Sequence, residues 1–218
     1  IRSENYSDFG NAFVWKLSSA YTINDKYTLR GSLSTGFRAP TLHQIYTQKA
    51  QYSFVPGQGI QVGGLVNNVS SQAGLLGIPK LKEETSTNFT FGLGGKVNRN
   101  LSFTVDYYSI NVEDRIVLST EIGATAAGNT PLDQVLSANN LSDVSFFVNA
   151  LDTKTSGLDV VLSYGNLDVG EGKLGFNLSG NYTISNERVG DVKDIALVAN
   201  AGQSVVNATQ EALLFTSR

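Results

Sequence analysis

Alternation between apolar and polar side chains is the feature that most constrains this chain of 218 residues. It recurs in windows that span residues 11–23, 27–37, 85–95, 101–116, 146–164 and 174–184. A period of two puts successive side chains on opposite faces of a β-strand. The sequence therefore predicts an all-β chain of about six strands, each with one apolar face and one polar face.

The connections between these windows are alternately short and long. The short ones are Asn24-Asp25, 98–100 and 165–173, and the long ones are 38–84, 119–145 and 185–218. Up-and-down barrels of the bacterial outer membrane have short periplasmic turns and longer extracellular loops. Most windows also match the ~9–11 residues that a tilted strand needs to cross a bilayer. The sequence therefore predicts antiparallel strands of a transmembrane β-barrel, with the long segments extracellular.

Two of the long segments contain signals of their own. Thr130-Pro131-Leu132-Asp133 is typical of a helix start, with a capping side chain followed by proline in the first turn, and it predicts a short helix. In the segment 185–218 we expect another short helix, and we expect the last residues to begin a further strand.

Charged side chains within the clear windows test the assignment of faces. Lys16, Arg30, Asp106 and Asp159 all fall on polar faces, whereas a Lys or Arg that faced lipid would cost ~2–4 kcal/mol at mid-bilayer. We expect Arg30, Asp106, Asp159 and Asn181 to face the lumen. The side chains expected to contact lipid are Leu33, Phe91, Phe103, Leu158, Val160, Leu162 and Phe176.

A soluble antiparallel sandwich is the alternative, because its apolar faces would alternate in the same way. Three observations favour the membrane barrel. Charged residues are only 16% of the chain, against roughly 25% in soluble domains. Tyr21, Tyr27 and Tyr164 lie beside the short turns, where a barrel has an aromatic girdle. The third observation is the difference in length between the two sets of connections.

Several classes of function find no support in the sequence. A net charge of -3 gives no reason to expect a nucleic-acid partner. We find no catalytic Ser/His/Asp order, no metal-spaced histidines and no phosphate-binding loop, so neither an enzyme nor a cofactor is expected. The chain contains no Met and begins at Ile1, and we therefore expect it to be a piece of a longer or processed chain.

Four segments carry a resemblance to a known family. Gly36-Phe37-Arg38-Ala39-Pro40 resembles the FRAP-type signature of TonB-dependent outer-membrane receptors. The other segments that resemble this family, in the same order along the chain, are 81–88, 104–116 and 146–159. Together they make the chain similar to these receptors over most of its length.

The resemblance implies a barrel of about 22 strands that is plugged by an N-terminal domain. Such receptors import scarce ligands such as iron chelates, haem, cobalamin or saccharides, with energy passed on by TonB. Residues 1–218 would then be a partial barrel domain, without the plug and the remaining strands, and would not transport alone. Its partners would be outer-membrane lipid, its own plug, TonB through the missing N-terminal region, and a small-molecule ligand. The alternatives are a surface-exposed structural or adhesive β-domain and a segment of a passive porin.

Arg30 and Arg38 are candidate site residues, because both should face the lumen. There they would pair with carboxylates of the plug or with an anionic ligand. We expect Arg38 to hold the first long loop near the ligand entrance, while Pro40 fixes the direction in which the loop departs. The alternative is a structural ion pair of these arginines with Asp106 or Asp159.

The first long loop contains the other candidates. His43 is the one histidine of the chain, and haem receptors of this family carry a histidine after the FRAP signature. It lies only three residues after Pro40, however, so an ordinary loop histidine is the alternative. Tyr46, Tyr52 and Phe54 are candidates for gripping a ligand, and the alternative is an aromatic cluster that packs on itself.

Overall fold

The computed structural model of the chain describes residues 1–6, 10–55 and 59–215. Contacts between residues divide the chain into two compact units. The sheet unit comprises Ile1–Phe37, Thr85–Val112 and Thr153–Glu187. The loop unit comprises Arg38–Glu84, Glu113–Asp152 and Arg188–Arg218, which correspond to the three long connections.

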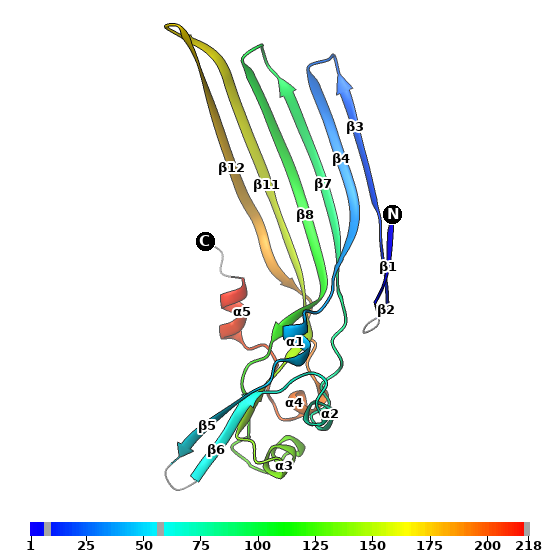
Figure 1. The fold of residues 1–218 in the computed structure, drawn as a ribbon, viewed down its shortest axis with the longest axis vertical. Helices are drawn as coiled ribbons and strands as arrows, with labels where there is room; N and C mark the ends of the chain where they lie inside the picture. The colour runs from blue at the N-terminus through cyan, green and yellow to red at the C-terminus, as the bar shows by residue number, and fades with distance from the viewer. Residues whose placement is uncertain (7–9, 56–58, 216–218) are drawn as a thin grey trace. The chain divides into compact units, whose positions relative to one another are not determined.

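A six-stranded sheet dominates the fold, and its order is β12-β11-β8-β7-β4-β3. Its strands are β3 (Lys16–Ile23), β4 (Tyr27–Arg38), β7 (Glu84–Lys96), β8 (Leu101–Leu118), β11 (Phe147–Val169) and β12 (Gly172–Val189). Strands that follow one another in sequence lie side by side in the sheet (Figure 1). The chain is therefore an up-and-down antiparallel β-structure, which confirms the predicted fold class.

The first short turn has the geometry that its residues favour. Asn24 and Asp25 both have φ of 53°, and the Lys26 amide donates to the carbonyl of Ile23 at 3.2 Å. Two positive φ values in succession define the hairpin turn that suits the right-handed twist of paired strands. Asn and Asp tolerate that backbone better than other residues with a side chain, so this turn could be located from the sequence.

The third short turn is tighter than predicted. The expected turn 165–173 is mostly strand, because β11 runs to Val169 and β12 starts at Gly172. Asn166 has φ of 57° within β11, so it interrupts the alternation without ending the strand. The amide of Gly165 still donates to the carbonyl of Asn100 at 2.8 Å. A local kink was thus mistaken for a turn.

The N-terminal segment also differs from the expectation of one strand over 11–23. β2 (Gly10–Val14) pairs with β1 (Arg2–Tyr6), which the sequence analysis missed, and β3 pairs with β4 instead. The chain changes partners at Trp15, whose amide donates to the side-chain oxygen of Thr35 at 3.2 Å. β1 was missed because its polar sequence carries no apolar alternation.

The loop unit contains much more regular structure than the predicted loops. Its helices are α1 (Leu42–Tyr46), α2 (Ser71–Leu75), α3 (Pro131–Ala138), α4 (Ala196–Asn200) and α5 (Ala208–Leu214). Its strands β5 (Lys49–Val55), β6 (Gly59–Leu65), β10 (Asp143–Ser145) and β9 (Ile122–Gly123) form a second sheet in that order. The prediction of a helix after Thr130 is confirmed by α3. The expected start of a further strand in the last residues is not found before residue 215, since α5 occupies 208–214, and 216–218 lie outside the described residues.

One hydrophobic core joins all three long connections. Val66 and Leu76 come from the first, Leu132 and Phe146 from the second, and Val205 from the third. Each buried side chain of this size stabilises the fold by ~1.5–3 kcal/mol. The parallel pairing of β10 with β6 adds a backbone link between the first two connections. The three connections therefore fold as one unit.

None of the described helices is long and apolar enough to span a bilayer.

Asp133 is the residue that fixes the start of α3. Its carboxylate accepts hydrogen bonds from the hydroxyl of Thr125 at 2.7 Å and from the Thr130 amide at 2.7 Å. In return, the Asp133 amide donates to the hydroxyl of Thr130 at 3.2 Å, which completes a capping box. The Thr125 hydroxyl, opposed by burial but helped by the bonds from Thr130, holds the Asp133 pKa far below its ordinary range.

Because the folded-state pKa of Asp133 is lowered, its contribution to stability is full above about pH 4, where an unfolded Asp loses its proton. It is lost progressively as the pH falls toward the folded-state pKa. We expect hydrogen exchange of α3, corrected for intrinsic rates, to speed up below that pH in the full-length protein. Asp133→Asn should give fast exchange at pH 7 already, whereas Asp191→Asn, at an exposed carboxyl in the same unit, should not. Equal exchange in both variants would contradict this role.

Candidate functional site

Arg30 and Asp106 form an ion pair on the polar face of the sheet unit. The Arg30 Nε donates to Asp106 Oδ1 at 2.7 Å, and its Nη2 contacts Oδ2. The two residues lie on β4 and β8, with β7 between them. A Cβ at Gly92 of β7 would collide with the Asp106 carboxylate, so the missing side chain is what lets the pair cross the middle strand. This pairing is the one that the sequence analysis gave as the alternative for Arg30.

A second set of polar contacts crosses β11. Asn181 of β12 donates to Asp159 Oδ1 at 2.7 Å and to the Tyr108 hydroxyl at 3.1 Å. Tyr108 reaches over Gly157, where a Cβ would clash with the phenol oxygen. Since Tyr108 stands two residues after Asp106 on the same strand, all these side chains share one face. Arg30, Asp106, Asp159 and Asn181 thus lie on one face of the sheet.

The apolar side chains of the sheet unit are exposed at the alternate positions of the same strands. Leu33, Phe91, Val160, Leu162 and Phe176 are all exposed to at least 40% of their surface. In a soluble sandwich these side chains would fill a closed core. They do not fill one within the part of the chain that the structure describes.

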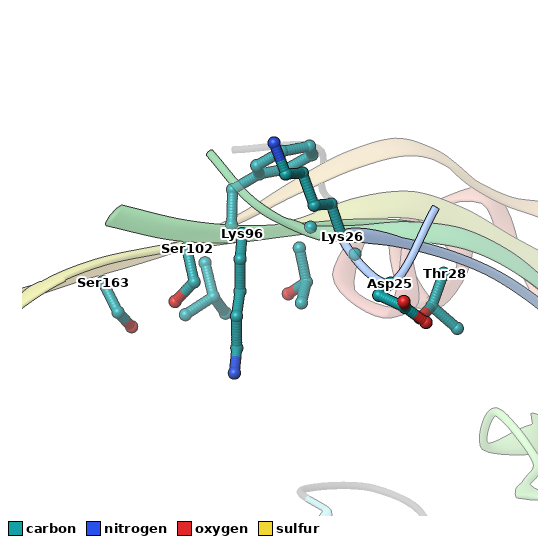
Figure 2. Close-up of a pocket in the computed structure, with 11 residues that line it drawn as sticks. Asp25, Lys26, Thr28, Lys96, Ser102 and Ser163 are labelled. Atoms are coloured by element: carbon teal, nitrogen blue, oxygen red, sulfur yellow. The ribbon is translucent and has the colours of Figure 1, made fainter. Parts of the chain in front are cut away.

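A hollow of about 290 Å³ lies on the sheet unit near the first two short turns. Its lining includes the hydroxyl groups of Thr28, Ser102 and Ser163, together with Lys96 and Asp25. In Figure 2 the side chains of Lys96, Ser102 and Ser163 extend to the same side of the strands, with Ser102 between the other two. The lining also includes the apolar side chains of Phe103 and Val161, so the hollow offers hydrogen-bond donors and acceptors beside an apolar surface.

Arg38 has a carboxylate partner within the loop unit. Its Nε donates to Glu84 Oε2 at 2.8 Å, its Nη2 contacts Oε1, and that oxygen also accepts from the Ile116 amide at 2.7 Å. Glu84 is only 6% exposed. Such a two-pronged pair is strong and directional. The sequence analysis did not name Glu84 as a partner of Arg38. The two residues are 46 positions apart in the sequence and meet only because β4 and β7 become neighbours in the sheet.

Four further charged residues join three segments of the loop unit. Asp114 pairs with Lys82 at 2.7 Å and with Lys193 at 2.8 Å, and Lys193 also pairs with Asp152 at 2.6 Å. Partial burial works to raise the pKa of Asp114, but the hydrogen bonds and charges of the two lysines outweigh it and lower that pKa. Sequence reasoning missed this network, because no local pattern identifies its members.

The aromatic candidates of the first connection are exposed. Tyr52 and Phe54 are 71% and 73% exposed, and Tyr46 is 54% exposed. In the hairpin of β5 and β6, Tyr52 is opposite Val62 and Phe54 is opposite Ile60, so these four side chains share one face. Exposure on this scale argues against an aromatic cluster that buries its own rings.

His43 lies in α1, where its ring meets the ring of Phe147 edge-on at 6.0 Å between centroids. No group of three or more His, Asp or Glu side chains among the described residues could hold a metal ion. The arrangement around His43 is therefore a packing contact within the loop unit.

The crossing of β7 by the Arg30–Asp106 pair can be tested at Gly92. In the full-length protein, Gly92→Ala should displace the Asp106 carboxylate and destabilise the fold by about 1–3 kcal/mol, the usual cost of overpacking. Gly180→Ala is the matched control, because no atom lies within 4 Å of a Cβ there. Urea unfolding followed by tryptophan fluorescence would measure both. Equal midpoints for the two variants would contradict the crossing.

Comparisons with known proteins agree with this architecture. The chain matches the family described as TonB dependent receptor-like, beta-barrel, over residues 1–211. Among curated relatives, it is 28% identical over 134 residues to a probable TonB-dependent siderophore receptor PirA of Acinetobacter baumannii. It is 21% identical over 129 residues to the vitamin B12 transporter BtuB of Photobacterium profundum. The alignments cover 60% and 59% of this chain but only 16% and 17% of those relatives.

Solved structures share the fold. The ferric enterobactin receptor PfeA of Pseudomonas aeruginosa superimposes with a TM-score of 0.56 at 19% sequence identity. That match covers 84% of this chain and 24% of the receptor. The family match extends over nearly the whole chain, and the six-stranded sheet with its polar face agrees with it. This chain therefore belongs to the β-barrel family of TonB-dependent receptors.

Proposed function

We propose that the chain forms part of the barrel wall of an outer-membrane receptor that imports a scarce ligand with energy supplied through TonB. The observation that carries this proposal is the polar face of the sheet. On it, Arg30 pairs with Asp106, and Asn181 donates a hydrogen bond to Asp159. A wall of this kind lines an aqueous lumen, while its opposite face meets lipid. The membership in the receptor family supplies the rest of the support.

An iron–siderophore complex is the ligand class that we favour. Relatives of this chain include a protein named as a probable siderophore receptor and a protein named as a ferric enterobactin receptor. A vitamin B12 transporter is also among them, so a cobalamin is the second candidate. The names of these three relatives do not point to haem or a saccharide.

Further partners follow from this proposal. The polar face would meet the protein's own plug domain, and the hollow near Lys96 and Ser163 offers hydrogen bonds to such a polypeptide. The exposed side chains Leu33, Phe91 and Phe176 would meet outer-membrane lipid. TonB would act through a region N-terminal to the barrel. A passive porin would need neither a plug nor TonB, and an adhesive domain would import nothing.

The loop unit would be the part that meets the ligand outside the cell. Tyr52 and Phe54 present their rings on one face of the β5–β6 hairpin. Aromatic side chains of this kind contribute much of the binding energy at recognition surfaces, because they bury a large area with little loss of conformational freedom. We therefore assign ligand contact to this face.

Uptake by cells that carry the full-length receptor tests the proposal. Uptake of a ferric siderophore should require both the receptor and TonB. Tyr52→Ser and Phe54→Ser should each weaken ligand binding by about 10-fold, which corresponds to about 1.4 kcal/mol. Val69→Ser is the control, because Val69 is exposed but lies outside the hairpin. Uptake that persists without TonB would instead indicate a passive porin.

Arg38 is assigned to holding the first long connection near the ligand entrance, through Glu84. Arg38→Ala in the full-length receptor should keep normal abundance in the outer membrane but weaken ligand binding or uptake several-fold. Arg38→Ala also leaves the buried Glu84 carboxylate without its cation, which destabilises the fold. The double variant Arg38→Ala/Glu84→Gln avoids this destabilisation, because it replaces the carboxylate by a neutral amide. If both variants bind and import normally, or fail only because less protein reaches the membrane, Arg38 serves the wall alone.

A further inference from the structure

The four-stranded sheet of the loop unit has two different faces. Ile122 and Val144 point from β9 and β10 into the hydrophobic core. The opposite face carries a hollow of about 250 Å³. Its lining includes Lys49, Gln51, Gly63, Glu121, Asp143 and Ser145, together with the apolar Leu65 between Lys49 and Ser145. This polar face is separate from the exposed aromatic face of the hairpin, because Lys49 and Gln51 alternate with Tyr52 along β5.

Asp143 is held in a definite orientation at this hollow. Gly63 of β6 is directly opposite Asp143 in the parallel ladder. A Cβ at position 63 would lie 2.5 Å from Asp143 Oδ1, so the carboxylate extends over the glycine toward β5. The hydroxyl of Ser142 donates to Asp143 Oδ2 at 2.6 Å. The carboxylate is thus positioned before any ligand arrives.

The charges around the hollow are separated rather than paired. Lys49 stands on β5, whereas Asp143 and Glu121 stand at the other side, beyond β6. Lys49 is opposite Leu65, which is opposite Ser145, so two strand spacings and an offset of two residues separate the backbones of Lys49 and Asp143 by roughly 12 Å. Among the described residues, none of these three side chains makes an ion pair. The hollow therefore has a positive side and a negative side, with space between them.

We propose that this hollow binds a small zwitterion. The ammonium group of the ligand faces Asp143 and Glu121, and its anionic group faces Lys49. Gln51 and Ser145 supply hydrogen bonds to the atoms between the two charges. A ligand with both charges satisfies both sides of the hollow, whereas a simple cation or a simple anion meets one favourable side and one repulsive side.

The proposal is tested with O-phosphoethanolamine, whose ammonium and phosphate groups are separated by two carbon atoms. Binding to the full-length receptor in a maltoside detergent is measured by ligand-observed NMR. We expect it to bind at least 10-fold more tightly than either ethanolamine or inorganic phosphate. Lys49→Gln and Asp143→Asn should each remove this preference, and Gly63→Val should abolish binding, because it fills the hollow and displaces Asp143.

Lys80→Gln and Asp191→Asn are the controls, since both residues are exposed in the same unit and neither lines the hollow. They should bind as the wild type does. The proposal is overturned if the wild type does not prefer the zwitterion, or if the control variants lose as much affinity as the site variants. Because the readout is binding of the probe, it is independent of siderophore uptake and of TonB.

The same chemistry occurs in a free solute and in a phosphatidylethanolamine headgroup. Reconstitution into bilayers with and without this lipid separates the two sources. If the lipid headgroup is the occupant, its presence should weaken the binding of the free probe, relative to bilayers of phosphatidylglycerol. If binding of the probe is the same in both bilayers, the occupant is a free solute. Either result supports the site, and no binding in either bilayer overturns it.

Discussion

Contacts that pass over a glycine hold this wall together. In a sheet, a side chain ordinarily meets only the neighbouring strand, because the next one lies about 10 Å away. Gly92 and Gly157 remove that limit, so that Arg30 reaches Asp106 and Tyr108 reaches Asn181 across a whole strand. Each such contact ties three strands instead of two. A single-layer sheet has no second sheet to pack against on its polar face, and these contacts supply cohesion that a soluble sandwich obtains from its core.

The loop unit uses buried and partly buried charges for a related purpose. Glu84 accepts from Arg38 and from the amide of Ile116, so one carboxylate joins both ends of the first connection to the beginning of the second. A carboxylate that is 6% exposed is stable only when its oxygens are well satisfied. The lysines that flank Asp114 extend the same arrangement to the third connection. Charge pairing thus holds the ends of the connections together, and the hydrophobic core packs their middle parts against one another.

Sequence periodicity predicted the part of the fold that is locally encoded. Alternation identified β4, β7 and most of β8, and it placed Arg30 and Asp106 on one face. It failed where the backbone leaves the regular strand conformation, as at Asp114 and Asn166 with φ of 55° and 57°. At such a kink the side chains after it switch to the opposite face of the sheet, so the alternation in the sequence breaks and the strand is predicted to be shorter than it is.

The candidate site was less predictable, for a different physical reason. The partner of Arg38 and the opposed charges of Lys49 and Asp143 depend on which strands become neighbours in space, and no local pattern encodes that. The β5–β6 hairpin is an intermediate case. Its alternating residues Tyr52, Phe54 and Ile60 were visible in the sequence, but the many Gly and Gln residues around them were read as an irregular loop.

The shared core of the three connections has a consequence for how such a receptor can diverge. Phe146 and Leu132 from one connection pack in the same cluster as Val66 from another and Val205 from the third. A length change or an exchange of one connection alone would leave the other two with unfilled volume, at a cost of several kcal/mol. Under the function proposed above, ligand preference can change through substitutions at the exposed hairpin and on the polar face of its sheet, because these side chains lie outside that core. The three connections behind them are inherited as a set, and a transplant of ligand specificity between relatives would have to move all three together.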